Sequence, residues 1–70
     1  MTKYAVIYEP ACTGYSAHVP DLPGCIAAGR THELTRKLMQ EAIEGHLELM
    51  REDGDAIPEP TQVVEMLEVA

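Results

Sequence analysis

The sequence contains neither Phe nor Trp, and its aromatic residues are three Tyr. Large aromatic side chains often dominate a core, so their scarcity predicts an aliphatic one. Basic residues are also few, because five Lys and Arg stand against twelve Asp and Glu, for a formal net charge of −7. Nucleic-acid binding needs a basic stripe that neutralises phosphates, and the sequence has none.

Long apolar runs and a leader sequence are missing as well. No run approaches the roughly 18 apolar residues that a membrane span needs, and the N-terminus lacks the charged-then-apolar layout of a signal peptide. We therefore expect a cytoplasmic protein. Cys12 and Cys25 form no C-x-x-C pair, and in a reducing compartment we expect small buried or half-buried thiols. The five glycines are scattered singly, which excludes a Gly-rich phosphate loop.

The length of 70 residues predicts one domain, residues 1–70, with a marginal core. Such small chains usually need a metal, a disulfide or a partner subunit, and here we favour self-association or another protein. The charge is uneven, because residues 31–70 carry ten of the twelve acids and account for the whole −7. An acidic half suits a basic partner protein, or is a solvated surface.

Three short segments have the composition of β-strands. Residues 3–9 contain Y-A-V-I-Y, rich in β-branched and aromatic residues, and Pro10 is expected to end that strand. Residues 15–19 alternate apolar and polar, the period of a strand with one wet face, and complete an antiparallel hairpin. Pro23-Gly24 suits the centre of a type II turn, after which residues 25–29 return as a third strand.

A helix is predicted from Thr31, a reasonable N-cap, to a C′ residue at Gly54. At about 100° per residue its apolar positions cover half of the circumference, which suits a helix lying on a sheet. Gly45 falls on that side, where close approach to the sheet would explain a helix-propensity cost of about 1 kcal/mol. The predicted apolar face consists of Leu34, Leu38, Met39, Ala42, Ile43, Gly45, His46, Leu49 and Met50.

The last apolar segment, residues 63–69, fits either a strand or one to two helical turns. We favour a strand, because a sheet covered by one helix gains a pairing partner. Reached from the third strand through a helix, it should lie parallel to that strand by a right-handed crossover. The predicted fold is therefore α+β with the order β-β-β-α-β, one helix on one face of a four-stranded mixed sheet.

The sequence predicts no metal, cofactor or catalytic site. Structural zinc sites use tightly spaced ligand pairs, whereas five to thirteen residues separate neighbours among Cys12, His18, Cys25, His32 and His46. Two-metal nucleases need several converging carboxylates. The strand region offers only Glu9 and Asp21, and the helix acids point away from the sheet.

Two further residues, His46 and Leu22, each have two interpretations. His46 lies mid-face on the predicted helix, where it suits the edge of the core or a subunit contact. Leu22 lies at a turn tip between Pro20 and Pro23, and it either tucks back or is offered to a partner. The prolines stiffen this loop and so lower the entropy lost on binding.

Three strings resemble the HicB family of antitoxins: Y-S-A-H-V-P-D-L-P-G-C (Tyr15–Cys25), G-R-T-H-E (Gly29–Glu33) and E-A-I-E-G-H-L-E (Glu41–Glu48). The N-terminal K-Y-A-V-I-Y-E and the late I-P-E-P-T fit as well, so the resemblance covers nearly the whole chain. It implies a partial ribonuclease H-like fold without nuclease residues. It also implies a non-enzymatic function, the masking of a small basic, mRNA-cleaving HicA-type toxin in a bacterial or archaeal cytoplasm.

Many members of that family carry an added C-terminal DNA-binding module. This sequence stops at Ala70, after the predicted last strand, so we expect a short form that binds no operator DNA alone. Two alternatives stay open: a solitary HicB-like protein acting as a ligand-binding or scaffold module, and a residual ribonuclease H-like nuclease.

If the resemblance holds, toxin binding should use an acidic surface and the stiff loop Pro20–Gly24, with the uncovered sheet face around Tyr15 and Ala17 as the alternative. We also expect a homodimer or higher oligomer that uses residues 63–69. The candidate partner contacts are Tyr15, His18, Asp21, Leu22, Glu41, Glu44 and Glu48.

Overall fold

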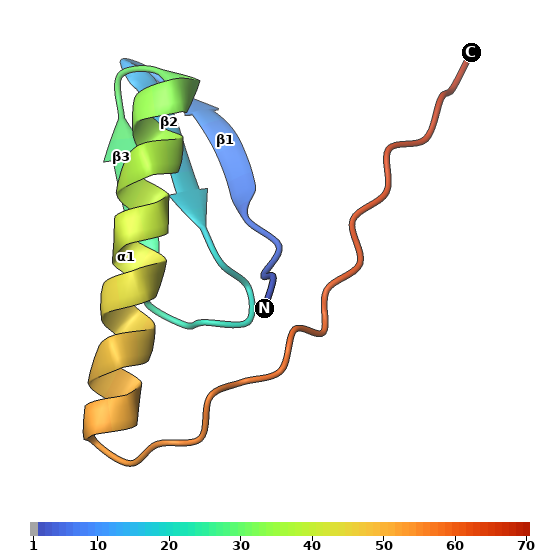
Figure 1. Cartoon of the computed structure of the whole chain (residues 1–70). Coiled ribbons are helices and arrows are strands. Elements are labelled where there is room, and N and C mark those ends of the chain that lie inside the picture. The colour runs from blue at the N-terminus through green and yellow to red at the C-terminus, as the bar shows by residue number, and fades with distance from the viewer. Residues whose placement is uncertain (1) are drawn as a thin grey trace.

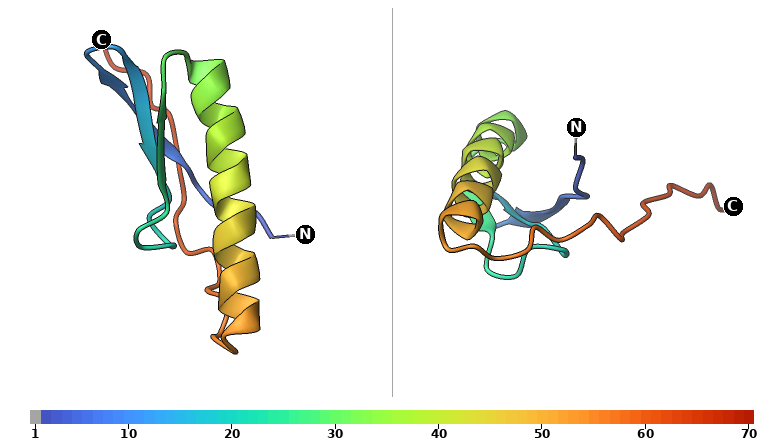
Figure 2. Two further views of the ribbon diagram at one scale, coloured as in Figure 1. Left: turned by 90° about the vertical axis from the view of Figure 1, so that its left-hand side faces the viewer. Right: turned by 60° about the horizontal axis from the view of Figure 1, so that its bottom comes forward.

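The computed structural model describes residues 2–70, which form three strands, one helix and an extended C-terminal segment. Strands β1 (Ile7–Ala11), β2 (Gly14–His18) and β3 (Ile26–Gly29) form an antiparallel sheet in the order β1-β2-β3. Helix α1 (His32–Glu52) lies over β2 and β3 as a second layer (Figure 1; Figure 2, left). The predicted α+β class, the three antiparallel strands and the single helix are confirmed.

The prediction of a fourth strand is wrong for this structure. Residues 63–69 belong to no strand or helix, and the sheet is wholly antiparallel rather than mixed. After α1 the chain crosses toward the N-terminal segment and then runs away from the body (Figure 1). It therefore does not lie along β3, where a parallel strand was expected. The ribonuclease H-like relation stays a prediction.

Strand β1 starts and ends later than predicted. Pro10 does not end the strand, because Pro10 pairs with Tyr15 and Ala11 pairs with Gly14. Proline lacks a backbone N–H, which excludes it from central strands but not from edges. Because β1 has one neighbour, β2, the sheet accommodates Pro10 within the strand.

The turn between β1 and β2 ends at a glycine that the fold requires. Gly14 has a φ of +152°, in the region that favours glycine. A Cβ at Gly14 would overlap the carbonyl oxygen of Gly29 and lie 2.6 Å from the Cα of Arg30. The hairpin end therefore lies directly against the backbone that joins β3 to α1.

Two consecutive turns join β2 to β3. The N–H of Leu22 donates to the carbonyl of Val19 at 3.1 Å, and the N–H of Cys25 donates to the carbonyl of Leu22 at 3.0 Å. Gly24 has a φ of +84° at the third position of the second turn, which confirms the predicted type II turn. Of the two alternatives for Leu22, the structure shows the first, since its side chain is 1% exposed and belongs to the core.

The core is small and aliphatic, as predicted. Its fully buried hydrophobic members are Ala17, Val19, Leu22, Cys25 and Met39. Partly buried side chains extend it toward the N-terminal segment and along the helix: Tyr4, Val6, Tyr8, Ala27, Ala42, Ile43 and Leu47. Buried Thr35 satisfies its hydroxyl by donating to the carbonyl of Thr31 at 2.7 Å.

Both predicted helix ends are confirmed. The Oγ1 of Thr31 accepts from the N–H of Leu34 at 3.0 Å, which is an N-cap bond. Gly54 follows the C-cap with a φ of +76°, and its N–H donates to the carbonyl of Arg51 at 3.2 Å.

The helix face that meets the sheet differs from the predicted one. The buried line runs through Thr35 and Met39, and half-buried Leu47, absent from the predicted face, extends the contact. Gly45 is exposed, and a Cβ there would meet nothing within 4 Å, so the expected close approach to the sheet is wrong. The apolar arc is wider than a three-stranded sheet can cover, so one flank stays in solvent. That flank consists of Leu34, Leu38, Gly45 and Leu49.

Candidate functional site

Three candidate acids lie together on the outer surface of α1. Glu41, Glu44 and Glu48 are all exposed, and each is three or four residues from the next. Residues at that spacing share one side of a helix. The amide of Gln40 donates to Oε1 of Glu44 at 3.2 Å. The three carboxylates are therefore accessible to a cationic partner.

Tyr15 and His18 do not meet, because they project from opposite faces of β2. The half-buried Tyr15 ring makes an edge contact with His32, with centroids 5.7 Å apart and planes at 81°. Tyr8 also contacts the His32 ring, with centroids 4.4 Å apart and planes tilted by 50°. Ala17, on the same face as Tyr15, is 3% exposed. The expectation that Tyr15 and Ala17 lie on the uncovered sheet face is therefore wrong, since α1 covers that face. Tyr15 as a partner contact stays a prediction.

His18 lies on the uncovered sheet face, where it pairs with Ile26 of β3. A shallow hollow of about 490 Å³ lies beside them, with Ser16 and Ala28 in its wall. Ile26 is 70% exposed, so this face combines an apolar patch with one imidazole. Ile7 and Glu9 of β1 pair with His18 and Ser16, so the carboxylate of Glu9 lies on this face as well.

Asp21 ties the C-terminal segment to the β2–β3 loop. Its carboxylate accepts from the N–H of Thr61 at 3.0 Å and from the hydroxyl of Thr61. The hydroxyl hydrogen bond first, and the backbone hydrogen bond second, lower the pKa of Asp21 from its ordinary value. Nearby, the hydroxyl of Tyr4 donates to the carbonyl of Pro58 at 2.5 Å. Asp21 therefore has a role within the chain.

We expect the Asp21 anchor to fail in acid. A lowered pKa means that the charged carboxylate is the bound form, so the anchor is complete above the unfolded value of about 3.9 and is lost as the pH falls through the lower folded value. Hydrogen exchange at the Thr61 amide should accelerate in that range relative to the intrinsic exchange rate at each pH. Asp21→Ala should accelerate it at pH 7, Asp21→Asn less so, and Glu59→Gln not at all. Unchanged protection in Asp21→Ala would contradict the anchor.

Leu22 is a candidate contact whose side chain is buried in this structure. Its buried side chain fills the core under the loop, so it cannot enter a pocket on a partner without unfolding the loop. The accessible surface of the loop is instead formed by the neighbouring residues Asp21, Pro23 and Gly24.

The C-terminal segment leaves large apolar side chains in water. Residues 63–69 extend away from the body in two views (Figure 1; Figure 2, right). The radius of gyration is 13.5 Å, against about 11 Å for a compact chain of this length. The exposed fractions are 93% for Val63, 67% for Val64, 92% for Met66, 75% for Leu67 and 90% for Val69.

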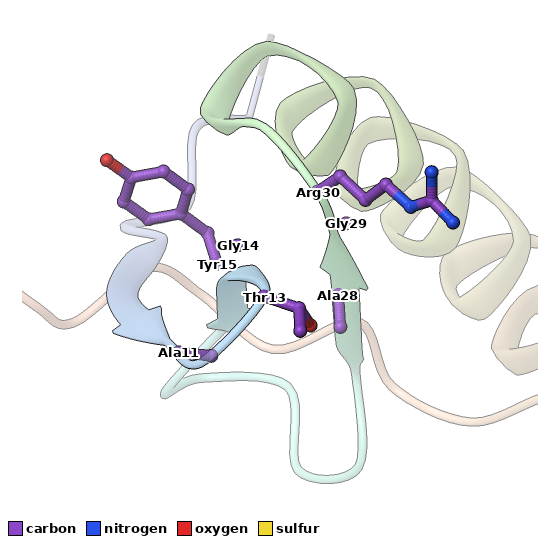
Figure 3. A pocket seen from close by; sticks show the side chains of 7 residues that line it. All are labelled: Ala11, Thr13, Gly14, Tyr15, Ala28, Gly29 and Arg30. Atoms are coloured by element: carbon purple, nitrogen blue, oxygen red, sulfur yellow. The ribbon is translucent and has the colours of Figure 1, made fainter.

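A second hollow of about 230 Å³ lies between the hairpin end and the start of α1. Figure 3 shows that the side chains of Tyr15 and Arg30 extend away from it. Small side chains and backbone line the rest, including Thr13, Gly14 and Gly29. The two lining residues with titratable side chains are therefore the ones turned outward.

The described part of the chain, residues 2–70, holds no group of three His, Cys, Asp or Glu side chains that could bind a metal ion. Cys12 is exposed and Cys25 is buried, and both thiols are free. Burial raises the pKa of the Cys25 thiol. Over the same residues, α1 is too polar to span a membrane.

Comparison with known proteins places the chain in a family. Residues 4–69 match the family described as the HicB_like antitoxin of bacterial toxin–antitoxin systems, and the chain belongs to that family. The fold is similar to a chain of the solved HicA3 and HicB3 toxin–antitoxin complex, with a TM-score of 0.73 and 28% identity. That match covers 86% of this chain and 70% of the other.

Two protein relatives were also found. An uncharacterized 14.9 kDa protein from the rep-hol intergenic region of Haemophilus phage HP1 is 37% identical over 60 residues, which are 86% of this chain and 45% of that protein. UPF0150 protein Ta0767 of Thermoplasma acidophilum is 35% identical over 57 residues, 80% of this chain and 83% of that protein. The chain therefore spans less than half of the phage relative.

Sequence reasoning missed one functional candidate, the exposed helix flank of Leu34, Leu38, Gly45 and Leu49. The width of the apolar arc of α1 could have indicated this flank, because the arc with Leu47 included is wider than one sheet face can cover.

Proposed function

We propose that this chain is an antitoxin that binds and masks a small basic, mRNA-cleaving toxin of the HicA type. The observation that carries the proposal is the family match over residues 4–69, supported by similarity to a chain of a toxin–antitoxin complex. The charge distribution agrees, because the acidic half of the sequence includes the exposed acids of α1. Masking needs no catalytic group in the antitoxin.

The mechanism is electrostatic association followed by steric occlusion. Exposed carboxylates attract a cationic protein over several ångströms and increase its rate of encounter. Once docked, the antitoxin excludes RNA from the toxin surface that it covers. We place this activity in the cytoplasm and assign no operator binding to residues 1–70 alone.

Charge reversal on α1 tests the proposal. Glu41→Lys with Glu48→Lys should slow association with a purified HicA-type toxin from the same source by about tenfold and weaken its salt dependence. The dissociation rate should change much less, because exposed charges act mainly before contact. The measurement is surface-plasmon resonance at several salt concentrations.

The matched control makes the same change in net charge elsewhere, through Glu65→Lys with Glu68→Lys. If both double variants slow association equally, net charge rather than the α1 surface guides the encounter. If the wild-type chain does not bind toxin, the solitary HicB-like module becomes the better assignment. RNA cleavage by purified protein that Asp21→Asn abolishes would favour the residual nuclease.

We further propose that the chain self-associates, with a second copy covering residues 63–69. Five apolar side chains in that segment are largely in water, and burying each contributes about 1.5–3 kcal/mol. Its extended backbone also has unpaired N–H and C=O groups, which favour pairing with another sheet. The neutral sheet half of a second copy offers no repulsion to Glu65 and Glu68.

Light scattering at micromolar concentration should therefore give a dimer or larger species. Val64→Ser with Leu67→Ser should shift it toward monomer without unfolding it, because both side chains lie outside the core. Glu65→Ser with Glu68→Ser is the matched control and should stay associated. A wild-type monomer throughout this concentration range would rule out the assignment.

A further inference from the structure

The exposed helix flank places three leucines and a glycine along one side of α1. Leu34, Leu38 and Leu49 are 42%, 36% and 58% exposed. With Gly45 they are spaced by four, seven and four residues, so they fall within about 60° of one another around the helix. The line spans most of α1, from its first turn to its last.

This flank lies on the β3 side of the helix. The opposite flank faces the N-terminal segment, where Ile43 and Leu47 share a hollow with Tyr4. Leu34, by contrast, lies close to Gly29 at the end of β3. Strand β3 is an edge of the sheet, so residues 2–70 supply no further helix or strand beyond the flank. At its N-terminal end a hollow of about 420 Å³ is lined by Thr31, Glu33, Leu34 and Lys37.

Gly45 is the part of this flank that the isolated chain does not explain. Glycine within a helix weakens it relative to alanine. Its usual justification is close packing, yet a Cβ at Gly45 would meet nothing within 4 Å. The space above Gly45 is thus available to the backbone of another molecule, between Leu38 and Leu49.

The charge around the flank selects the kind of partner. Glu41, Glu48 and Glu52 are exposed and lie within about 40° of it on the outer side, with Lys37 near the N-terminal end. A second copy would bring acidic helices or the acidic residues 63–69 against this rim. A basic protein would instead pair its cations with these carboxylates while burying the leucines.

We infer that the leucine–glycine flank of α1 is the docking surface for the basic toxin. This rests on the proposed antitoxin function and names the surface that performs it. The exposed leucines supply the apolar contact that the buried Leu22 cannot. Gly45 lets the toxin backbone come close to the helix between Leu38 and Leu49. The acidic rim steers the encounter, as tested by the reversal of Glu41 and Glu48.

The test uses the full chain and a purified HicA-type toxin from the same source. Leu38→Ala with Leu49→Ala should increase the dissociation constant about tenfold or more, mainly through faster dissociation. Gly45→Leu should weaken binding at least as much. In the free chain, Gly45→Ala should raise the melting temperature, since the added methyl group contacts nothing and favours the helix. The same variant should bind toxin less tightly than wild type.

Gln40→Leu is the matched control for Gly45→Leu. It adds an exposed leucine to the same helix on the opposite flank and should leave toxin binding unchanged. If wild type binds toxin and the flank variants bind equally well, the toxin docks elsewhere and this inference is overturned while the proposed function stands. If the flank variants lose self-association and keep toxin binding, a second copy occupies the flank, which also overturns it. Failure of the wild type to bind would instead overturn the proposed function.

Discussion

Replacing Gly14 with alanine should unfold the domain. The new Cβ would overlap the carbonyl oxygen of Gly29 and crowd the Cα of Arg30, and backbone cannot move aside as a side-chain tip can. Alanine would also be strained at a φ of +152°. Overpacking and backbone strain each cost about 1–3 kcal/mol. Together they approach the ~3–5 kcal/mol that a core of this size supplies.

Circular dichroism of Gly14→Ala should show lost helix signal at 25 °C or a melting temperature lower by tens of degrees. Alanine variants of two other glycines separate the effect of overpacking from that of backbone strain. Gly24→Ala should destabilise moderately, since Gly24 has a φ of +84° but open space around it, and Gly45→Ala should stabilise. A Gly14→Ala variant as stable as wild type would show that the hairpin does not lie against the β3–α1 connection.

Leu22→Ala should destabilise the fold by about 2–5 kcal/mol, as large-to-small core substitutions do. Leu22 is 1% exposed and contacts the cluster that includes Val19, Cys25 and Met39. A residue acting as an exposed binding anchor would instead lower affinity and leave stability unchanged. The two roles therefore predict opposite results in the same two measurements.

Urea denaturation of Leu22→Ala should show the lost stability directly. Ile26→Ala is the matched control, because it also truncates an apolar side chain, but one that is 70% exposed on the uncovered sheet face. Its cost should stay below about 1 kcal/mol. Equal costs for both variants would mean that Leu22 is not part of the core.

Features decided by local geometry could be predicted from the sequence. Pro23-Gly24 makes a type II turn because only a residue like glycine tolerates its third position. Thr31 caps α1 and Gly54 terminates it for equally local reasons. The family strings added what no local rule gives, namely the class of protein.

Features decided by packing could not be predicted. The apolar residues of α1 cover so wide an angle that their periodicity does not determine which of them meet the sheet. Gly45 favoured the wrong part of this arc, because a glycine within a helix is typical of close packing, and Gly45 is not packed here. Residues 63–69 have strand composition, but whether they pair depends on where the chain goes after Pro58. Side-chain contacts from Asp21 and Tyr4 decide that path, and neither shows in a pattern of apolar residues.

The same distinction between local geometry and packing applies to the candidate site. Exposure of Glu41, Glu44 and Glu48 follows from helical spacing, which the sequence displays. The sequence allows two alternatives for Leu22, because its neighbours Pro20 and Pro23 restrict the loop backbone without determining which way the leucine points. The burial of Leu22 depends on the depth of the core beneath the loop, which is a property of the folded chain.

Pro10 within β1 limits how sheets of this protein can grow. An edge strand with all its N–H groups can template an unlimited series of added strands, the route by which sheets polymerise into fibrils. Strand β1 is one of the two edges here, and Pro10 removes a donor from it, with the charged Glu9 beside it. A neighbouring molecule can therefore join this edge only over a short stretch. The expected consequence is an assembly that closes at a small number of copies and stays dispersed when the protein is concentrated.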